Sequence, residues 1–156
     1  GSLLRQVAWL EEEEKKLLGE VATLAEAPRH VRAVRALSKL AGVGVWTALV
    51  FLLELGDPSR FRNRRQVGAH LGLVPSSDDS GETVGKHGHI TRQGPARLRK
   101  ALCQAVWARI RSDGGEKAVY ERIVKRNPKH KKIAVVASMR RLAIRLWHEA
   151  CRSRAG

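Results

Sequence analysis

The chain has 156 residues, 43% of them hydrophobic, and a formal net charge of +15. This length suits one domain with a sizeable core, and the apolar fraction excludes an intrinsically disordered chain. The most apolar stretch, VWTALVFLLEL, is too short to span a bilayer, and no signal peptide is visible. A membrane protein is therefore not indicated.

The positive charge is distributed unevenly along the chain. Residues 1–56 hold seven Lys or Arg and seven Asp or Glu, whereas residues 57–156 hold 23 and 8. The whole excess lies in the last hundred residues. A folded domain this basic favours a polyanionic partner, with nucleic acid as the first choice, over a charge that only confers solubility.

The cysteines and histidines do not suggest a metal site. Cys103 and Cys151 fall in apolar helical patterns, which indicates reduced core thiols of a cytoplasmic protein. His87 and His89 form the tripeptide HGH, but no cysteine pair accompanies them. We assign no metal ligand and expect no cofactor in this chain.

The N-terminal part reads as a helical arm. Gly1-Ser2 has the look of an expression scar, so we expect a piece of a longer protein. Residues 3–27 form the arm, and its apolar positions follow a heptad spacing that Glu14 interrupts: Leu3, Val7, Leu10, Leu17, Val21 and Leu24. Three heptads leave two readings open, half of a coiled coil or a helix packed on its own domain. Residues 28–156 are expected to form the helical domain.

A G-V-G tripeptide separates two helical patterns in that domain. Pro28 is placed to open the first helix, PRHVRAVRALSKL, and VWTALVFLLEL forms the second. This arrangement is typical of a helix-hairpin-helix motif, in which the backbone N–H groups of Gly42, Val43 and Gly44 would contact a phosphate. The alternative is an ordinary helical hairpin buried in the core.

The remaining chain predicts more helices around one long polar loop. Asn63 is placed to cap a short helix over 64–73, and Thr91 or Gly94 to cap a helix that starts at Pro95. Residues 76–90 form the loop, with the composition of one small β-hairpin around Gly85–Gly88. Further helices are predicted over 116–126 and 129–152. The predicted fold class is all-α.

The last helix has two faces. Its apolar stripe holds Val135, Met139, Leu142 and Leu146, and a basic face lies roughly opposite, with Arg141, Arg145, His148 and Arg152. This basic face is either solvated or a surface along which nucleic acid binds, and the charge excess favours the binding surface.

Several motifs together resemble one group of transposases. They are LAGVGVWTALVFLLELGDPSRFRNRRQVGAHLGLVP, then DSG, GKHGHITRQGPARLRKAL and RLAIRLWH, over about residues 37–148. Their order is similar to the C-terminal domain of transposases of the IS110 family, which is also grouped with IS116 and IS902 elements. G-V-G alone is common, whereas the ordered set G-D-P-x-R-F, G-L-V-P, S-G and G-x-I-T-x-x-G is far more specific.

The resemblance implies a two-part recombinase. Its N-terminal RuvC-like domain would hold Mg²⁺ on a DEDD carboxylate set, and a coiled-coil arm and this helical domain would follow. It also implies a structured guide RNA and a place in the cytoplasm and nucleoid of a bacterial or archaeal cell. We expect a homo-oligomer, because recombination joins two DNAs and the arm has an apolar seam. The RuvC-like domain is not in this sequence, so we expect the fragment to be inactive alone.

The family's nucleophilic serine matches Ser80, which Gly81 follows. A serine nucleophile would conserve the phosphodiester bond energy in a phosphoserine ester. Asp79 departs from the Ser or Thr that often precedes this serine in the family. The cations close in sequence would neutralise phosphate or line DNA or RNA near Ser80: Lys86, His87, Arg92, Arg97, Arg99 and Lys100. Without the resemblance, SSDDSGE is an ordinary polar turn.

Two other functions compete with this one. The first is a non-catalytic helix-hairpin-helix module that only binds nucleic acid. The second is a dimerisation domain with an incidental charge, which would bind nucleic acid no more tightly than nonspecifically.

Overall fold

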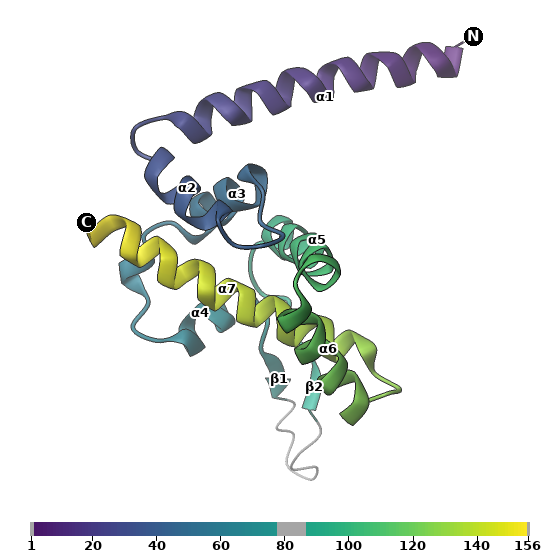
Figure 1. The fold of residues 1–156 in the computed structure, drawn as a ribbon, viewed down its shortest axis with the longest axis vertical. Helices are drawn as coiled ribbons and strands as arrows, with labels where there is room; N and C mark the ends of the chain where they lie inside the picture. The colour runs from purple at the N-terminus through teal and green to yellow at the C-terminus, as the bar shows by residue number, and fades with distance from the viewer. Residues whose placement is uncertain (1, 78–86, 156) are drawn as a thin grey trace.

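The computed structural model describes residues 2–77 and 87–155, with the backbone alone for 76, 77, 87–89 and 155. The helices are α1 (Ser2–Glu26), α2 (Val31–Ser38), α3 (Val45–Leu55), the 3-10 turn η1 (Pro58–Arg60), α4 (Arg64–His70), α5 (Ala96–Ser112), α6 (Gly114–Arg126) and α7 (Lys131–Ala155). Two short strands, β1 (Pro75–Ser77) and β2 (His87–Ile90), lie between α4 and α5 (Figure 1). The predicted all-α class is confirmed. Within the described ranges, no helix is long and apolar enough to cross a membrane.

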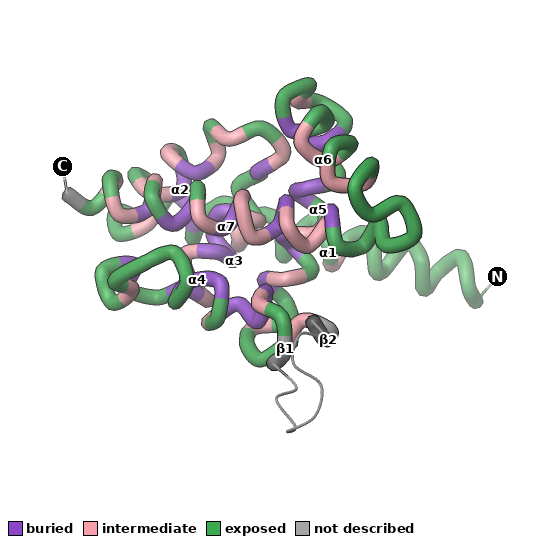
Figure 2. Tube along the Cα trace, turned by 90° about the horizontal axis from the view of Figure 1, so that it is seen from below, coloured by how far each residue is buried: buried purple, intermediate pink, exposed green. Residues whose placement is uncertain are grey.

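Helix α7 runs through the middle of the helical domain. It contacts α2, α3, α4, α5, α6 and η1. Of its predicted stripe, Met139, Leu142 and Leu146 are buried and Val135 is half-buried. The buried segments of α2, α3, α5 and α7 gather around one centre (Figure 2). Burial of these apolar side chains is the main stabilising term of the fold.

Helix α1 projects from this body. Figure 1 shows most of its length extending away from the other helices. Near its C-terminal end Ala25 is buried and Val21 half-buried, where α1 contacts α2 and α3. Leu3, Leu10 and Leu17 are 77%, 58% and 57% exposed. The heptad positions before Val21 are therefore not packed against the helix's own domain, whereas Val21 is.

Two predicted helix starts are wrong. Residues 27–30 form a turn, in which the N–H groups of His30 and Val31 both donate to the carbonyl oxygen of Ala27, so α2 begins at Val31 rather than at Pro28. The cap of α5 is Pro95, without a side-chain hydrogen bond, instead of Thr91 or Gly94. The Thr91 N–H is already used, because it donates to the carbonyl oxygen of Val74.

One predicted cap is confirmed. The Asn63 side-chain oxygen accepts hydrogen bonds from the N–H groups of Arg65 and Gln66, at 3.0 and 3.1 Å. A buried bond then ties the preceding turn to α7, because the Trp147 indole N–H donates to the carbonyl oxygen of Pro58 at 2.9 Å. The G-D-P-x-R-F segment is thus anchored to the central helix.

The strand pairing lies elsewhere than predicted. A hairpin around Gly85–Gly88 would pair residues within 82–91, but β2 pairs antiparallel with β1 instead. Pro75 is opposite Ile90 and Ser77 is opposite His87, with an irregular register between them. Gly88 therefore belongs to a strand, and the pairing spans residues 78–86, which lie outside the described residues.

Candidate nucleic-acid interface

The loop between α2 and α3 packs its first glycine against α5. Gly42 has a φ of +77°, and a Cβ there would lie 2.5 Å from the carbonyl oxygen of Ala105 and 2.9 Å from the backbone nitrogen of Arg109. Only glycine permits both this conformation and this approach. Val43 is 5% exposed. Gly42 and Val43 therefore shape the loop and pack inward, and the Val43 N–H already donates to the carbonyl oxygen of Leu40 at 3.0 Å. Their predicted phosphate contacts stay a prediction.

Gly44 behaves differently. It is exposed, has an extended backbone, and is the N-cap of α3 without a side-chain hydrogen bond. The next two residues, Val45 and Trp46, are 45% and 46% exposed. The first N–H groups of a helix have no intrahelical partner and carry the positive end of the helix dipole. The start of α3 is thus the part of the G-V-G segment best suited to an anion.

A buried ion pair holds this loop on α5. Arg109 and Glu116 each have side chains 5% exposed, and the Arg109 Nε lies 3.4 Å from the Glu116 Oε2. The Arg109 Nη1 donates to the carbonyl oxygen of Ala41 at 3.1 Å, and its Nη2 lies 3.1 Å from Asp113. One guanidinium therefore connects the α2–α3 loop to α6.

Asp113 caps α6 beside this pair. Its Oδ1 accepts from the N–H groups of Gly115 and Glu116 at 2.9 and 3.2 Å. The hydrogen bond from the Glu116 N–H lowers the pKa of Asp113, and the charge of Arg109 lowers it further. The carboxylate is thus held in its charged form next to the buried arginine.

The predicted basic face of α7 is partly neutralised by Glu116. The Arg141 Nε lies 3.8 Å from Glu116 Oε1, and the Arg145 Nη1 lies 4.0 Å from Glu116 Oε2. Both side chains keep 41% and 47% of their surface exposed. They can still face a phosphate, but they share one carboxylate with Arg109. The role of Glu116 is not evident from the sequence, where its only signal is a place in the first turn of the helix that becomes α6.

A close backbone contact holds the two ends of the polar segment together. A Cβ on Gly72 would overlap the carbonyl oxygen of Gln93, and a Cβ on Gly94 would overlap that of His70. The φ angles of the two glycines are +64° and +131°. We call the backbone of residues 70–75 and 90–95 the clamp. It positions β1 and β2, and hence both ends of 78–86.

Arg99 reinforces the clamp. Its Nη1 donates to the carbonyl oxygen of Gly94 at 2.9 Å and to that of Leu71 at 3.3 Å. The side chain is therefore already engaged inside the protein. Arg99 therefore has a structural role in the clamp, and its predicted role of lining DNA or RNA near Ser80 stays a prediction for which fewer N–H donors are left.

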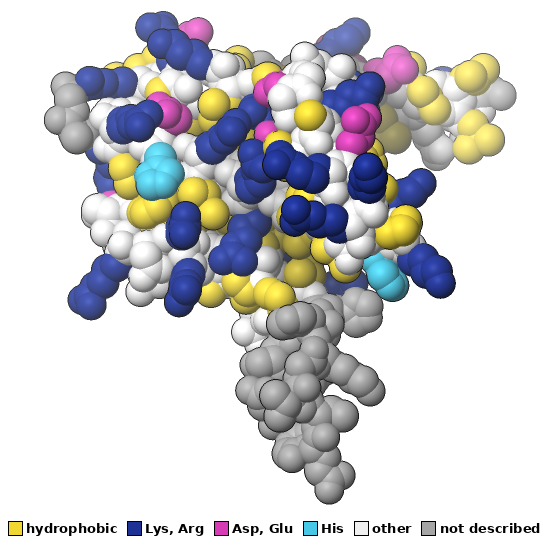
Figure 3. All heavy atoms as spheres, turned by 60° about the horizontal axis from the view of Figure 1, so that its bottom comes forward, with side chains coloured by type: hydrophobic (Ala, Val, Ile, Leu, Met, Phe, Trp, Pro, Cys, Tyr) yellow, Lys and Arg dark blue, Asp and Glu magenta, His cyan; other side chains and the backbone are white. Residues whose placement is uncertain are grey.

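The other predicted cations near the clamp are exposed. Arg92, which adopts a φ of 55°, lies in the clamp, and Arg97 and Lys100 lie in the first turns of α5. The α5 N-terminus has no side-chain cap, so its dipole adds to their positive potential. Lys and Arg side chains are spread over the face in Figure 3, with few acidic ones between them. This surface suits a polyanion.

The side chains of three predicted site residues lie outside what the structure describes. Ser80 and Lys86 lie in 78–86, outside the described residues. His87 starts β2, where only the backbone is described. Among the described residues there is no group of three or more His, Cys, Asp or Glu side chains that would hold a metal ion.

Comparison with known proteins identifies the kind of domain. Residues 34–121 match the transposase IS116/IS110/IS902 family. This range contains the α3 N-terminus, the clamp, the whole of α5 and Glu116.

Individual relatives agree with this match. A putative transposase of Sinorhizobium fredii is 42% identical over 47% of this chain and 19% of its own length. The IS110 insertion element protein of Streptomyces coelicolor is 27% identical over 92% of this chain and 34% of its own length. A pilin gene-inverting protein of Moraxella bovis is 29% identical over 68% of this chain and 33% of its own length. The chain thus spans about a third or less of these relatives.

Proposed function

Because this chain belongs to the transposase IS116/IS110/IS902 family, we propose that it is the nucleic-acid-binding and serine-bearing part of an insertion-sequence transposase. The match over residues 34–121 is the observation that carries the proposal. The relatives named as transposases and as a pilin gene-inverting protein support it, since both names describe DNA rearrangement. The basic surface supplies the physical means to hold DNA.

DNA would be held at two places on this surface. The uncapped start of α3, with Gly44, would bind a backbone phosphate through N–H groups. Arg92, Arg97 and Lys100 would neutralise phosphates beside the clamp. Arg141 and Arg145 would contribute weaker contacts, because each already faces Glu116. These contacts recognise the backbone and carry no base sequence.

Ser80 is the proposed nucleophile. Its Oγ would attack a DNA phosphorus, the bond from phosphorus to the leaving sugar oxygen would break, and that oxygen would take up a proton. The phosphoserine ester would keep the bond energy until the hydroxyl of another strand displaces the serine. The clamp supports this role, since it holds the two strands that flank Ser80 in the sequence beside the exposed Arg92.

The remaining parts of the proposed enzyme come from outside this chain. A RuvC-like domain of the full-length protein would supply carboxylates and Mg²⁺, and a structured guide RNA would choose the target. The exposed leucines of α1 would pair with a second copy as a coiled coil, since Leu3, Leu10, Leu17 and Leu24 repeat every seven residues and all are solvent-exposed. Without these parts the chain is proposed to bind nucleic acid but not to cut it.

The experiment joins the chain to the missing N-terminal part. The full-length protein is incubated with its RNA, Mg²⁺ and a suicide DNA substrate, and covalent adducts are mapped by denaturing gel and peptide mass spectrometry. We expect a DNA phosphoester on Ser80 that Ser80→Ala abolishes. Ser76→Ala and Ser77→Ala are matched controls from the same segment and should retain the adduct.

The outcomes separate the candidate functions. An adduct on another serine would keep the enzyme class and reject Ser80. Recombination by Ser80→Ala, with no adduct in the wild type, would make this domain a binding module without chemistry. Recombination activity that requires Ser80 but proceeds without RNA would contradict only the proposed guide RNA.

A further inference from the structure

The outer face of α2 carries a row of three cations. Arg32, Arg35 and Lys39 follow the i, i+3, i+7 spacing that places side chains on one helical face, and all three are exposed. Val34 and Leu37 face the core and anchor the helix. Among the residues that the structure describes, no acidic side chain lies within ion-pair distance of these three cations.

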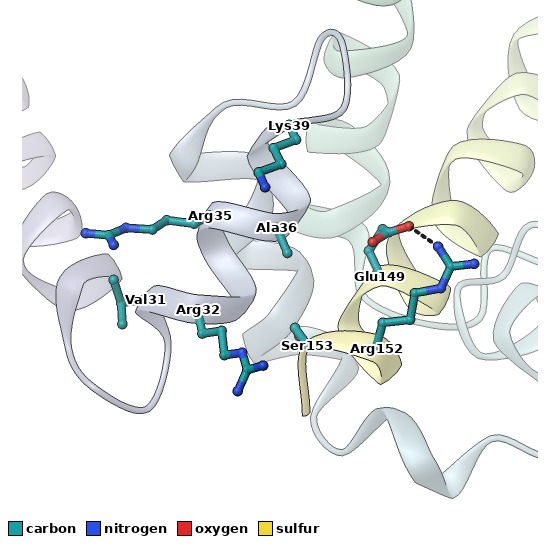
Figure 4. A pocket seen from close by; sticks show the side chains of 8 residues that line it. All are labelled: Val31, Arg32, Arg35, Ala36, Lys39, Glu149, Arg152 and Ser153. Atoms are coloured by element: carbon teal, nitrogen blue, oxygen red, sulfur yellow. Dashed lines mark hydrogen bonds and ion pairs between the residues drawn. The ribbon is translucent and has the colours of Figure 1, made fainter. Parts of the chain in front are cut away.

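A groove of about 450 Å³ runs between this row and the last turns of α7. Its lining also includes Ala36 and Ser153, which are small, and Arg152, which stands on the α7 side (Figure 4). Small side chains leave room for the close approach of a ligand. We call this region the α2–α7 groove.

Glu149 is the one carboxylate among the residues that line the groove. Its Oε1 accepts a hydrogen bond from the Arg152 Nη1 at 2.8 Å. Four cationic side chains and one anionic side chain thus line the groove, so its lining carries a net positive charge of three. An acidic ligand would be attracted here, and Glu149 would oppose it.

The shape favours a long anion over a small one. Arg32 and Lys39 are seven residues apart, so the cationic row is about 10 Å long at the helical rise of about 1.5 Å per residue. A row of this length can contact more than one phosphate of a strand, because a strand carries a phosphate at about every 3.4 Å of duplex axis.

We propose that the α2–α7 groove binds the phosphodiester backbone of nucleic acid. This contact region is additional to the start of α3 and the cations beside the clamp, and its ligand class rests on the proposed function. Arg32, Arg35 and Lys39 neutralise successive phosphates. Ala36 and Ser153 admit the backbone, and Glu149 limits the affinity by pairing with Arg152.

The first test removes the row. The 156-residue chain and its Arg32→Gln/Arg35→Gln/Lys39→Gln variant are titrated onto labelled duplex DNA and onto an RNA duplex of the same sequence. Fluorescence anisotropy is read over about 50 to 200 mM NaCl, where loss of each phosphate contact lowers the salt slope by about 0.9. We expect the slope to fall by about two to three for at least one duplex, and that duplex identifies the ligand.

A control variant removes the same charge elsewhere. Arg5→Gln/Lys15→Gln/Lys16→Gln also loses three exposed cations, all from α1. Its slope should change by less than about 0.5, because no phosphate contact is lost. Circular dichroism of both variants checks that their helix content is unchanged. Equal slope losses in the two variants would mean that only net charge matters, which would overturn the proposal that the α2–α7 groove binds nucleic acid.

A second test predicts a gain of binding, which misfolding cannot imitate. Glu149→Gln should bind about threefold more tightly, because a carboxylate inside the groove no longer repels phosphate. Glu121→Gln is the matched control, since Glu121 also pairs with a cation on its own helix, Lys117, at 4.0 Å. If the Glu149→Gln variant binds the duplexes with unchanged affinity, the proposed role of the groove is rejected and the proposed function is left intact. Failure of the wild-type chain to bind either duplex would overturn both.

Discussion

The guanidinium of Arg109 and the carboxylate of Glu116 form an ion pair that is almost completely removed from water. Each side chain is 5% exposed, and Nε and Oε2 are 3.4 Å apart. Removing one partner of a buried pair leaves the other charged and desolvated, which costs about 3–5 kcal/mol. Arg141 and Arg145, at 3.8 and 4.0 Å from Glu116, compensate part of this charge. We therefore expect Arg109→Ala to lower the free energy of unfolding by up to about that amount in urea denaturation.

Arg111 provides the comparison for this prediction. It lies on the same helix but is exposed, so Arg111→Ala should change the free energy of unfolding by less than about 0.5 kcal/mol. Equal effects of the two substitutions would show that the pair does not stabilise the fold. A selective loss at Arg109 would show that its buried contacts with Glu116 and the Ala41 carbonyl together stabilise the fold.

The clamp predicts a strong glycine requirement at one position. Gly94 combines a φ of +131° with a backbone neighbour that a Cβ would overlap, whereas Gly56 has a φ of +67° and open space around it. Gly56→Ala should cost only backbone strain, about 1–3 kcal/mol, and Gly94→Ala about 2 kcal/mol more because the clamp must open. Thermal unfolding of both variants measures the difference, and similar costs would contradict the close approach.

Arg99 and Arg97 should respond differently to truncation. Arg99 donates to two clamp carbonyls, so Arg99→Ala should raise amide hydrogen exchange at Thr91 and Arg92 about 5- to 30-fold, equivalent to about 1–2 kcal/mol. Arg97 is exposed, so Arg97→Ala should leave exchange unchanged and weaken nucleic-acid binding. The reverse pattern would return Arg99 to a direct role at the ligand.

The lowered pKa of Asp113 predicts that part of the folding stability is lost in acid. The pKa of its carboxyl is lowered from 3.8, chiefly by the hydrogen bond from the Glu116 N–H. A lowered folded-state pKa contributes stability that is complete above the unfolded value and is lost as pH falls through the folded value. The wild-type chain should therefore lose this contribution at pH values below 3.8.

Asp113→Asn isolates this effect. Asparagine is also a good N-cap but does not titrate in this range. The variant should show a shallower loss of thermal stability below the unfolded pKa, and no difference in slope at neutral pH. An identical acid profile for the two proteins would assign the sensitivity to other carboxyls.

Much of the fold was predictable because it depends on local chemistry. The apolar spacing of α7, the amphipathic pattern of α1 and the side-chain cap at Asn63 act within a few residues, so they can be read directly from neighbouring letters. The ordered motifs also pointed to the family that residues 34–121 match. The helix start at Val31 was missed, because a turn at Ala27 competed with the preference of proline for a first helical turn.

The partners of the charged side chains were decided only by tertiary structure. Arg97, Arg99, Arg141 and Arg145 look alike in the sequence, yet Arg99 is bound to backbone carbonyls and the last two share Glu116, while Arg97 stays exposed. Likewise, the sequence identified the G-V-G turn, and only the packing of α5 against Gly42 turned two of its residues inward. The physical reason is that charge and hydrogen bonding depend on distances between segments far apart in the chain, which no local pattern contains.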